Sequence, residues 1–272
     1  SDDSISFPAH SYDQPLSIYA ISKDATRKLL YRSMGKDGAK PPILKKEIIR
    51  YEVKGEHYNA ALLYPLNYRK GIKYPVIFNI YEKKSKDITT HMLPSLYNNQ
   101  GFDPMHYVYQ DYFVLLPDLA YETGEAGHSI SQSVEELVKI LDRNKSVDLD
   151  RMAVTGVSFG GYESFYLMAK GKWFKTGYAG VGIADLPSNA MGFTKSTGVP
   201  NYFKDERQQA RMDRSLFDNY QGYLENSPIY HLRSMKQPIL IWLGQKDANV
   251  NPDQSRMFFL GMKRLGKKGV LL

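Results

Sequence analysis

Short apolar runs alternate along the chain with segments in which apolar residues recur at helical spacing. From Lys45 onward, the short runs predict strands at 47–53, 58–64, 74–81, 112–117, 152–155, 179–184 and 238–243, with another beginning at Gly269. The helical spacing predicts helices that begin after Ser129, span 161–170, and run from Asn251-Pro252 to Leu265. Strands that alternate with helices predict an α/β fold, with a mostly parallel sheet and helices on both of its faces.

The first 44 residues have a different pattern. Residues 16–21 alternate as a short strand does, and glycines and a Pro-Pro pair at 35–42 predict a loop or linker. A segment of this length cannot bury a core of its own. We therefore expect two parts, an N-terminal β segment with its linker at 1–44 and a larger α/β domain at 45–272.

Composition is that of an ordinary soluble domain with a real core. Hydrophobic residues make up 42% of the 272 residues and charged residues 24%. No apolar run approaches the roughly 18 residues that a membrane span requires, so no span is expected. The first residues carry no pattern of a signal peptide, and the cellular compartment stays open.

Charge and cysteine content exclude several classes of partner and site. The chain has no cysteine, which excludes disulfides and thiolate metal ligands. The net charge is +7, but the basic residues occur as scattered pairs, so we expect no nucleic-acid partner. Motifs for phosphate, dinucleotide or metal binding are missing from the sequence. No cofactor is therefore expected, and the oligomeric state is not determined by these features.

The most informative motif lies between a predicted strand and a predicted helix. Residues 154–161 read Val-Thr-Gly-Val-Ser-Phe-Gly-Gly, a G-x-S-x-G pattern with Ser158 at its centre. In this pattern the serine lies on a tight strand-to-helix turn, where its hydroxyl can reach a substrate carbonyl. The motif predicts a serine nucleophile; the alternative is a glycine-rich turn that only packs a helix on the sheet.

Two aspartates follow predicted strands. Asp247 lies in the loop after the strand 238–243, where a carboxylate can orient an imidazole beside the serine. The alternative for Asp247 is an ordinary turn residue that accepts hydrogen bonds from its own backbone. Asp118 follows the strand 112–117, and we expect it to shape the turn of the loop after it.

Three stretches together resemble the prolyl oligopeptidase family of serine peptidases: residues 150–162 around Ser158, Glu225-Asn-Ser-Pro228, and Gly244-Gln-Lys-Asp-Ala-Asn-Val250. The resemblance covers residues 45–272. It implies an α/β-hydrolase fold with Ser158 as the nucleophile and Asp247 as the acid that orients a histidine. In such proteins a β-propeller precedes the hydrolase domain, and residues 1–44 are similar to its last strands and linker.

The resemblance also implies two oxyanion donors: the backbone N–H of Phe159, which directly follows the nucleophile, and the hydroxyl of Tyr81 at the end of the strand 74–81. Here the chain departs from the family pattern, which has a Gly-Gly-Pro-like loop after this position. The chain has Glu82-Lys83-Lys84-Ser85 instead. The loop is therefore bulkier and more highly charged than the resemblance implies.

No histidine fits the family pattern. The family places its catalytic histidine about thirty residues after the aspartate, which is beyond Leu272. All six histidines, at positions 10, 57, 91, 106, 128 and 231, precede Asp247. His231 lies in a helical stretch after Pro228, and we expect it to be a packing or surface residue. We therefore expect that the base lies beyond the chain's end and that the 272-residue chain by itself is nearly inactive.

These patterns predict a serine hydrolase that cleaves peptide bonds through an acyl-enzyme on Ser158. The loop after Ala184 carries Met191 and Phe193, which are candidates for an acyl-side substrate pocket. Two alternatives remain: an esterase on the same fold, and a non-catalytic binding protein that has kept the elbow. The Glu82-Lys83-Lys84 loop favours the second alternative.

Overall fold

The computed structural model describes residues 5–11, 14–32, 44–89 and 101–272. Its central feature is an eight-stranded sheet in the order β13-β12-β9-β8-β6-β7-β5-β4. Neighbouring strands from β13 through β12, β9, β8 and β6 to β7 pair in parallel. Strands β5 and β4 add an antiparallel edge next to β7. The sheet strands are β4 (Lys46–Val53), β5 (Glu56–Leu63), β6 (Tyr74–Asn79), β7 (Phe113–Pro117), β8 (Val147–Val157), β9 (Thr176–Gly180), β12 (Ile239–Trp242) and β13 (Gly269–Leu271).

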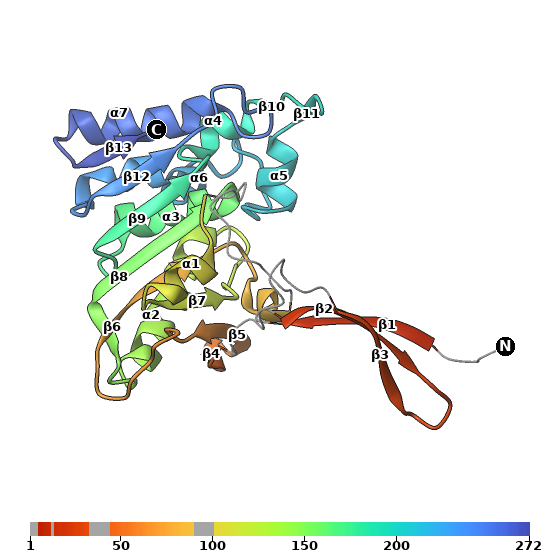
Figure 1. Ribbon diagram of the computed structural model, residues 1–272. Coiled ribbons are helices and arrows are strands. Elements are labelled where there is room, and N and C mark those ends of the chain that lie inside the picture. The colour runs from red at the N-terminus through yellow and green to blue at the C-terminus, as the bar shows by residue number, and fades with distance from the viewer. Residues whose placement is uncertain (1–4, 12–13, 33–43, 90–100) are drawn as a thin grey trace.

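Helices cover both faces of this sheet, as Figure 1 shows. A large core joins one face to the three longest helices, and a smaller core joins the other face to α1. Alternate residues of a strand point to opposite faces, so Val76 and Phe78 of β6 enter the large core and Ile77 enters the small one. The helices are α1 (Pro104–Tyr109), α2 (Ala126–Leu141), α3 (Phe159–Lys170), α4 (Leu186–Ala190), α5 (Tyr202–Arg207), α6 (Tyr220–Glu225) and α7 (Pro252–Arg264), with 3-10 turns η1 (Ser85–Thr89) and η2 (Pro228–Ser234).

The predicted elements agree with the structure except at several boundaries. Helix α2 begins at Ala126, whereas the prediction had it begin after Ser129. Strand β9 spans Thr176–Gly180, so the strand expected at 179–184 lies earlier in the chain. Helix α7 begins as predicted, because the side chain of Asn251 accepts a hydrogen bond from the Asp253 N–H. The predicted α/β class with a mostly parallel sheet is confirmed.

Two smaller sheets lie outside the central one. The N-terminal sheet consists of β1 (Ile5–Ser11), β2 (Gln14–Ile21) and β3 (Arg27–Arg32), and it extends away from the α/β part in Figure 1. Only β2 was expected from the alternation; all six residues of β3 are exposed, so no buried face marks that strand in the sequence. The other sheet pairs β10 (Phe193–Thr194) with β11 (Val199–Pro200). The division into 1–44 and 45–272, and the propeller origin of the first part, stay predictions.

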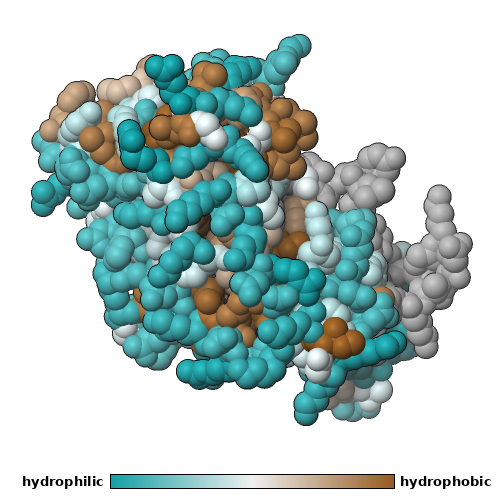
Figure 2. All heavy atoms as spheres, turned by 90° about the vertical axis from the view of Figure 1, so that its left-hand side faces the viewer, coloured by the Kyte–Doolittle hydropathy of each residue, from teal (hydrophilic) through white to brown (hydrophobic). Residues whose placement is uncertain are grey.

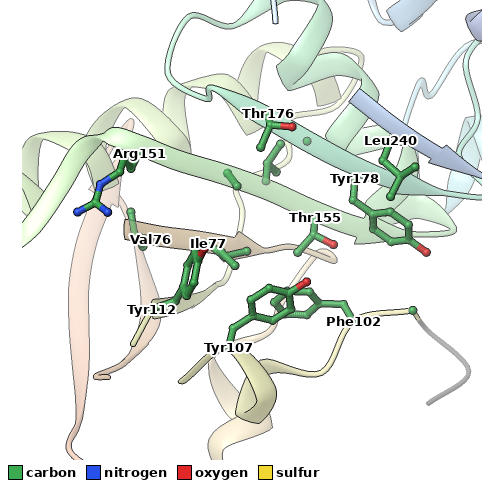
Figure 3. Close-up of a pocket in the computed structure, with 14 residues that line it drawn as sticks. Val76, Ile77, Phe102, Tyr107, Tyr112, Arg151, Thr155, Thr176, Tyr178 and Leu240 are labelled. Atoms are coloured by element: carbon green, nitrogen blue, oxygen red, sulfur yellow. The ribbon is translucent and has the colours of Figure 1, made fainter. Parts of the chain in front are cut away.

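One part of the sheet has a face that the described helices do not cover. Leu240 and Trp242 of β12 are 37% and 40% exposed, whereas Ile239 and Ile241 point into the large core. Leu240 also lines a hollow of about 350 Å³. In Figure 3, Tyr107 and Phe102 lie on one side of this hollow, with Tyr178 and Leu240 on the other. Figure 2 shows a mostly hydrophilic surface with separate hydrophobic areas. None of the described helices is long and apolar enough to span a bilayer.

Candidate active site

Ser158 lies at the turn between β8 and α3, where the motif predicts it. Its backbone has φ 60° and ψ −120°, a conformation that is strained for a residue with a side chain. The Ser158 N–H donates to the Gly180 carbonyl over 2.8 Å, and the Ser158 carbonyl accepts from the Gly161 N–H over 2.9 Å. These bonds fasten the strained turn to β9 on one side and to α3 on the other.

The glycines around Ser158 allow this turn to pack closely. A Cβ atom on Gly156 would lie 2.3 Å from the Gly160 carbonyl oxygen, and one on Gly160 would lie 2.4 Å from the Ile80 oxygen. A Cβ on Gly161 would lie 2.5 Å from the Gly180 oxygen. Real side chains do not make such contacts, so these positions need glycine. The close packing brings the start of α3 against the ends of β6 and β9.

Ser158 and Tyr81 line the same cleft, which has a volume of about 320 Å³. The ends of β6 and β8 form its floor, and the loop after β6 forms one wall. Lys83 and Lys84 both line this wall; Lys84 forms a 2.7 Å ion pair with Asp87, which also lines the cleft. The loop in which the chain departs from the family pattern therefore brings two lysines to the cleft, one of them paired with Asp87.

The two expected oxyanion donors are both at this cleft or next to it. The Tyr81 hydroxyl accepts a hydrogen bond from Gln209 Nε2 over 3.0 Å, which leaves its own proton free to donate. Partial burial raises the pKa of Tyr81 above its ordinary value, so the hydroxyl keeps that proton at neutral pH. Phe159 is the first residue of α3, and no described hydrogen bond uses its backbone N–H. An N–H at the first position of a helix has no partner within the helix and can bind an anion.

Asp118 holds the loop that carries the two lysines. Its Oδ1 accepts from the Ser85 N–H over 2.9 Å, and its Oδ2 accepts from the Ser85 hydroxyl over 2.7 Å. The sequence placed Asp118 in the turn that follows its own strand, but its side chain contacts the loop after β6 instead. This contact joins segments 33 residues apart, so no local pattern could have predicted it.

Asp247 lies in the loop after β12, as predicted. Because β8 and β12 run in parallel in one sheet, the loops of Ser158 and Asp247 lie at the same edge of that sheet. Asp247 Oδ1 accepts from the N–H groups of Asn249 and Val250, over 2.8 and 3.1 Å. Its Oδ2 makes no described hydrogen bond. One oxygen thus caps the loop, and the other is free to orient an imidazole.

None of the described histidines has a described role in this cleft. None of them lines it, and none is hydrogen-bonded to Ser158 or Asp247 in the described structure. His231 bonds to the Glu225 carbonyl, and its ring packs against Tyr166 in the second half of α3. His106 bonds to Gln110. His91 lies outside the described residues. The prediction that none of these serves as the base is not tested further by the structure.

Met191 and Phe193 are 53% and 62% exposed, and neither lines the cleft of Ser158 and Tyr81. A buried polar cluster beneath their loop joins α4 to α5: Asn189 Nδ2 donates to both carboxylate oxygens of Asp205 over 3.0 Å. Burial raises the pKa of Asp205 to about 7. The role of Met191 and Phe193 in an acyl-side pocket stays a prediction.

The Glu225-Asn-Ser-Pro228 stretch is a structural junction between helices. Asn226 Oδ1 accepts from the Gly127 N–H at the start of α2 over 2.9 Å. Ser227 Oγ accepts from the Leu186 N–H at the start of α4 over 2.9 Å. The Tyr162 hydroxyl of α3 donates to the Asn226 carbonyl over 2.9 Å. This stretch therefore fixes three helices around the elbow. A group of three or more His, Asp or Glu side chains able to hold a metal was not found in the described part of the chain.

The fold and the elbow together define an α/β-hydrolase with a serine at the nucleophile position. The model of the prolyl oligopeptidase family matches residues 123–272, which is more than half of the chain. The chain belongs to this family, as the three sequence stretches predicted.

Similar proteins include peptidases of several kinds. An uncharacterized peptidase, YuxL of Bacillus subtilis, is 23% identical over 278 residues, which cover 96% of this chain and 39% of YuxL. The acylamino-acid-releasing enzyme of Sus scrofa is 26% identical over 234 residues, 82% of this chain and 30% of that enzyme. The Pyrococcus horikoshii acylaminoacyl peptidase structure has a TM-score of 0.76 at 17% identity and is matched over 100% of this chain and 43% of its own. The chain thus spans less than half the length of these relatives.

Proposed function

We propose that this chain is the catalytic part of a serine peptidase and that Ser158 is its nucleophile. The observation that carries the proposal is the strained turn at Ser158, which opens into the same cleft as Tyr81. Strain of this kind is retained only where the surroundings enforce it, and it is concentrated at functional sites. Family membership supports a hydrolytic role for that turn.

In the proposed reaction, Ser158 Oγ attacks a peptide carbonyl carbon, and its proton passes to a histidine base. The Phe159 N–H and the Tyr81 hydroxyl donate to the oxyanion that forms. As the C–N bond breaks, the base returns the proton to the leaving amine; water then hydrolyses the acyl-enzyme. Asp247 orients the histidine and stabilises its charged form. The peptidase names of the relatives support a peptide bond as the target.

No histidine follows Asp247 in this chain, and none of the described ones lines the cleft. We therefore propose that the 272-residue chain reacts slowly and that added imidazole can act as a base in place of the histidine. A general base contributes about 10²–10⁴-fold to a reaction of this type. A freely diffusing base recovers part of this factor, about tenfold or more.

Labelling of the chain with a fluorophosphonate, with the modified residue mapped by peptide mass spectrometry, tests the proposal. Labelling at Ser158 is expected to be slow in buffer, to accelerate about tenfold or more with imidazole, and to vanish in Ser158→Ala. Asp247→Asn is expected to reduce the acceleration. Ser131→Ala, on α2, is the matched control and is expected to behave as the wild-type chain does.

Rapid stoichiometric labelling without imidazole would contradict the proposal that the 272-residue chain reacts slowly for want of a base. Failure to label Ser158 under any condition would contradict the nucleophile and support the non-catalytic alternative. The esterase alternative is separated by substrates: a p-nitrophenyl ester and the corresponding peptide anilide are compared in the presence of imidazole. Turnover of the ester alone would favour an esterase.

A further inference from the structure

The turn that carries Tyr81 has an unusual backbone. Glu82, the next residue, has a φ of 43°, in the left-handed region that favours glycine. Its carbonyl accepts a hydrogen bond from the Leu119 N–H over 2.6 Å, which fastens the turn to the chain after β7. A strained residue without glycine's freedom needs further contacts to hold it in place.

Glu163 supplies the first of these contacts. It lies on α3, five residues after Ser158, and its side chain is fully buried. Its Oε1 accepts a hydrogen bond from the Glu82 N–H over 2.9 Å and another from the Tyr121 hydroxyl. Its Oε2 is buried without a partner. The helix that begins beside Ser158 is thereby bonded to the turn of Tyr81.

Arg211 closes the arrangement on the outer side. One guanidinium nitrogen forms a 2.7 Å ion pair with the Glu82 carboxylate, and the group lies 4.5 Å from the centre of the Tyr121 ring. The other terminal nitrogen donates to the Gln209 carbonyl over 2.6 Å. The side chain of Gln209 in turn donates to the Tyr81 hydroxyl. Tyr81 is therefore held at its backbone through Glu82 and at its hydroxyl through Gln209.

We propose that Glu163 and Arg211 are positioning residues that fix the Tyr81 hydroxyl relative to Ser158. We call the contacts that Glu163 and Arg211 make with the turn of Tyr81 the clamp. The inference rests on the proposed function, because it assigns the clamp a role in oxyanion binding. Donors of an oxyanion hole act only when they are held within a fraction of an ångström of the required place. A loop rich in glycine could adopt the turn without strain; here, buried and charged contacts from α3 and from residues 209–211 hold it.

The chemistry of Glu163 provides a conservative test variant. Burial, opposed by the bonds from Tyr121 and from the Glu82 N–H, raises the pKa of Glu163 to about 8. The neutral carboxyl accepts both bonds through one oxygen, and the amide oxygen of glutamine can accept the same two. Glu163→Gln therefore keeps the clamp, whereas Glu163→Leu removes both acceptors. Leu137→Ala, a core change on α2, is a control for a general loss of stability.

Two measurements on the 272-residue chain test the inference. The first is amide hydrogen exchange at Glu82, which is expected to be about tenfold or more faster in Glu163→Leu than in the wild-type chain. The second is imidazole-dependent labelling of Ser158. In Glu163→Leu the rate at saturating probe is expected to fall roughly 10- to 100-fold, with little change in the probe concentration at half-saturation. Glu163→Gln and Leu137→Ala are expected to change neither measurement by more than about twofold.

Arg211→Met is a second variant, chosen because this side chain is partly exposed and its loss is compatible with folding. It is expected to slow the imidazole-dependent labelling of Ser158 about three- to tenfold, without a change in the probe concentration at half-saturation. It carries the test if Glu163→Leu does not fold.

Three results would overturn the inference: labelling in Glu163→Leu equal to that in Leu137→Ala, an equal loss in Glu163→Gln and Glu163→Leu, or fast exchange of the Glu82 amide in the wild-type chain. If the wild-type chain does not label at all, the proposed function fails. In that case the exchange measurement still decides whether the clamp exists.

Discussion

At the scale of single residues, backbone strain marks the candidate site. Glu82, Ser158 and Val181 are not glycines, yet all have positive φ angles, of 43°, 60° and 44°. They lie just after β6, β8 and β9, which are neighbouring strands of the sheet. In open α/β sheets, ligands bind outside the carboxyl ends of such strands. These three strained residues therefore lie where the fold is expected to bind a substrate.

A prediction at this scale concerns the pH dependence of stability at Glu163. Because the folded chain raises its pKa from 4.5 to about 8, Glu163 stays protonated in the folded state over a range in which it is ionised in the unfolded state. Stability associated with this carboxyl is present below about pH 4.5 and is lost as the pH rises through about 8. Glu163→Gln removes this loss.

Urea unfolding at pH 5 and pH 8 measures the effect. Between these values, the unfolding free energy of the wild-type chain is expected to fall relative to that of Glu163→Gln by on the order of 2–4 kcal/mol. The charges of Glu82 and Arg211 affect this carboxyl in opposite directions and are present in both proteins. Parallel pH profiles for the two proteins would show that Glu163 does not titrate in this way.

At the scale of elements, the position of the site depends on how closely α3 approaches the sheet. Gly161 lets the helix contact Gly180 and Gly182, at the end of β9 and in the loop after it. A side chain at this position would push the helix from the strands, and with it the turn of Ser158. The glycine therefore matters for packing and not only for the turn itself.

Gly161→Ala is accordingly expected to destabilise the chain by about 1–3 kcal/mol, the usual cost of overpacking. Gly244→Ala is the matched control, because a Cβ at that position would meet nothing closer than 3.8 Å. Its effect is expected to lie within about 0.5 kcal/mol. Urea or thermal unfolding of both variants provides the comparison. An equal effect in the two would show that close packing at α3 is not the cause.

At the scale of the whole molecule, the described structure leaves apolar side chains on one face of the sheet exposed. Leu240 and Trp242 of β12 and Val270 of β13 are 37%, 40% and 53% exposed. The hollow in Figure 3 continues this surface toward α1. A contiguous apolar surface of this kind binds apolar molecules.

We therefore expect the 272-residue chain to bind the dye anilinonaphthalene sulfonate at this face. Leu240→Lys is expected to reduce the bound fluorescence by roughly half or more, because a charge there disrupts the apolar surface. Ile72→Lys, in the loop before β6, is the control; Ile72 is 46% exposed and lies outside the hollow. Equal losses in the two variants would place the dye elsewhere.

Much of the framework could be predicted from the sequence, because it depends on contacts between near neighbours. Apolar periodicity predicts the strands and long helices, and the glycines around Ser158 predict a tight turn. Element boundaries were less accurate, as at α2 and β9, because tertiary hydrogen bonds decide where an element ends. The exposed strand β3 had no buried face that alternation could reveal.

The sequence by itself determined the α/β class, the elbow at Ser158 and the loop that carries Asp247, since each follows from local spacing. The family resemblance implied Tyr81 as an oxyanion donor, and in the tertiary structure Tyr81 lines the same cleft as Ser158. Only the tertiary structure revealed that Asp118, Glu163 and Arg211 hold the loop between them. Those contacts join residues 33, 81 and 129 positions apart. A periodic pattern indicates which side of an element is buried, but it does not indicate which distant polar group a side chain on that side will contact.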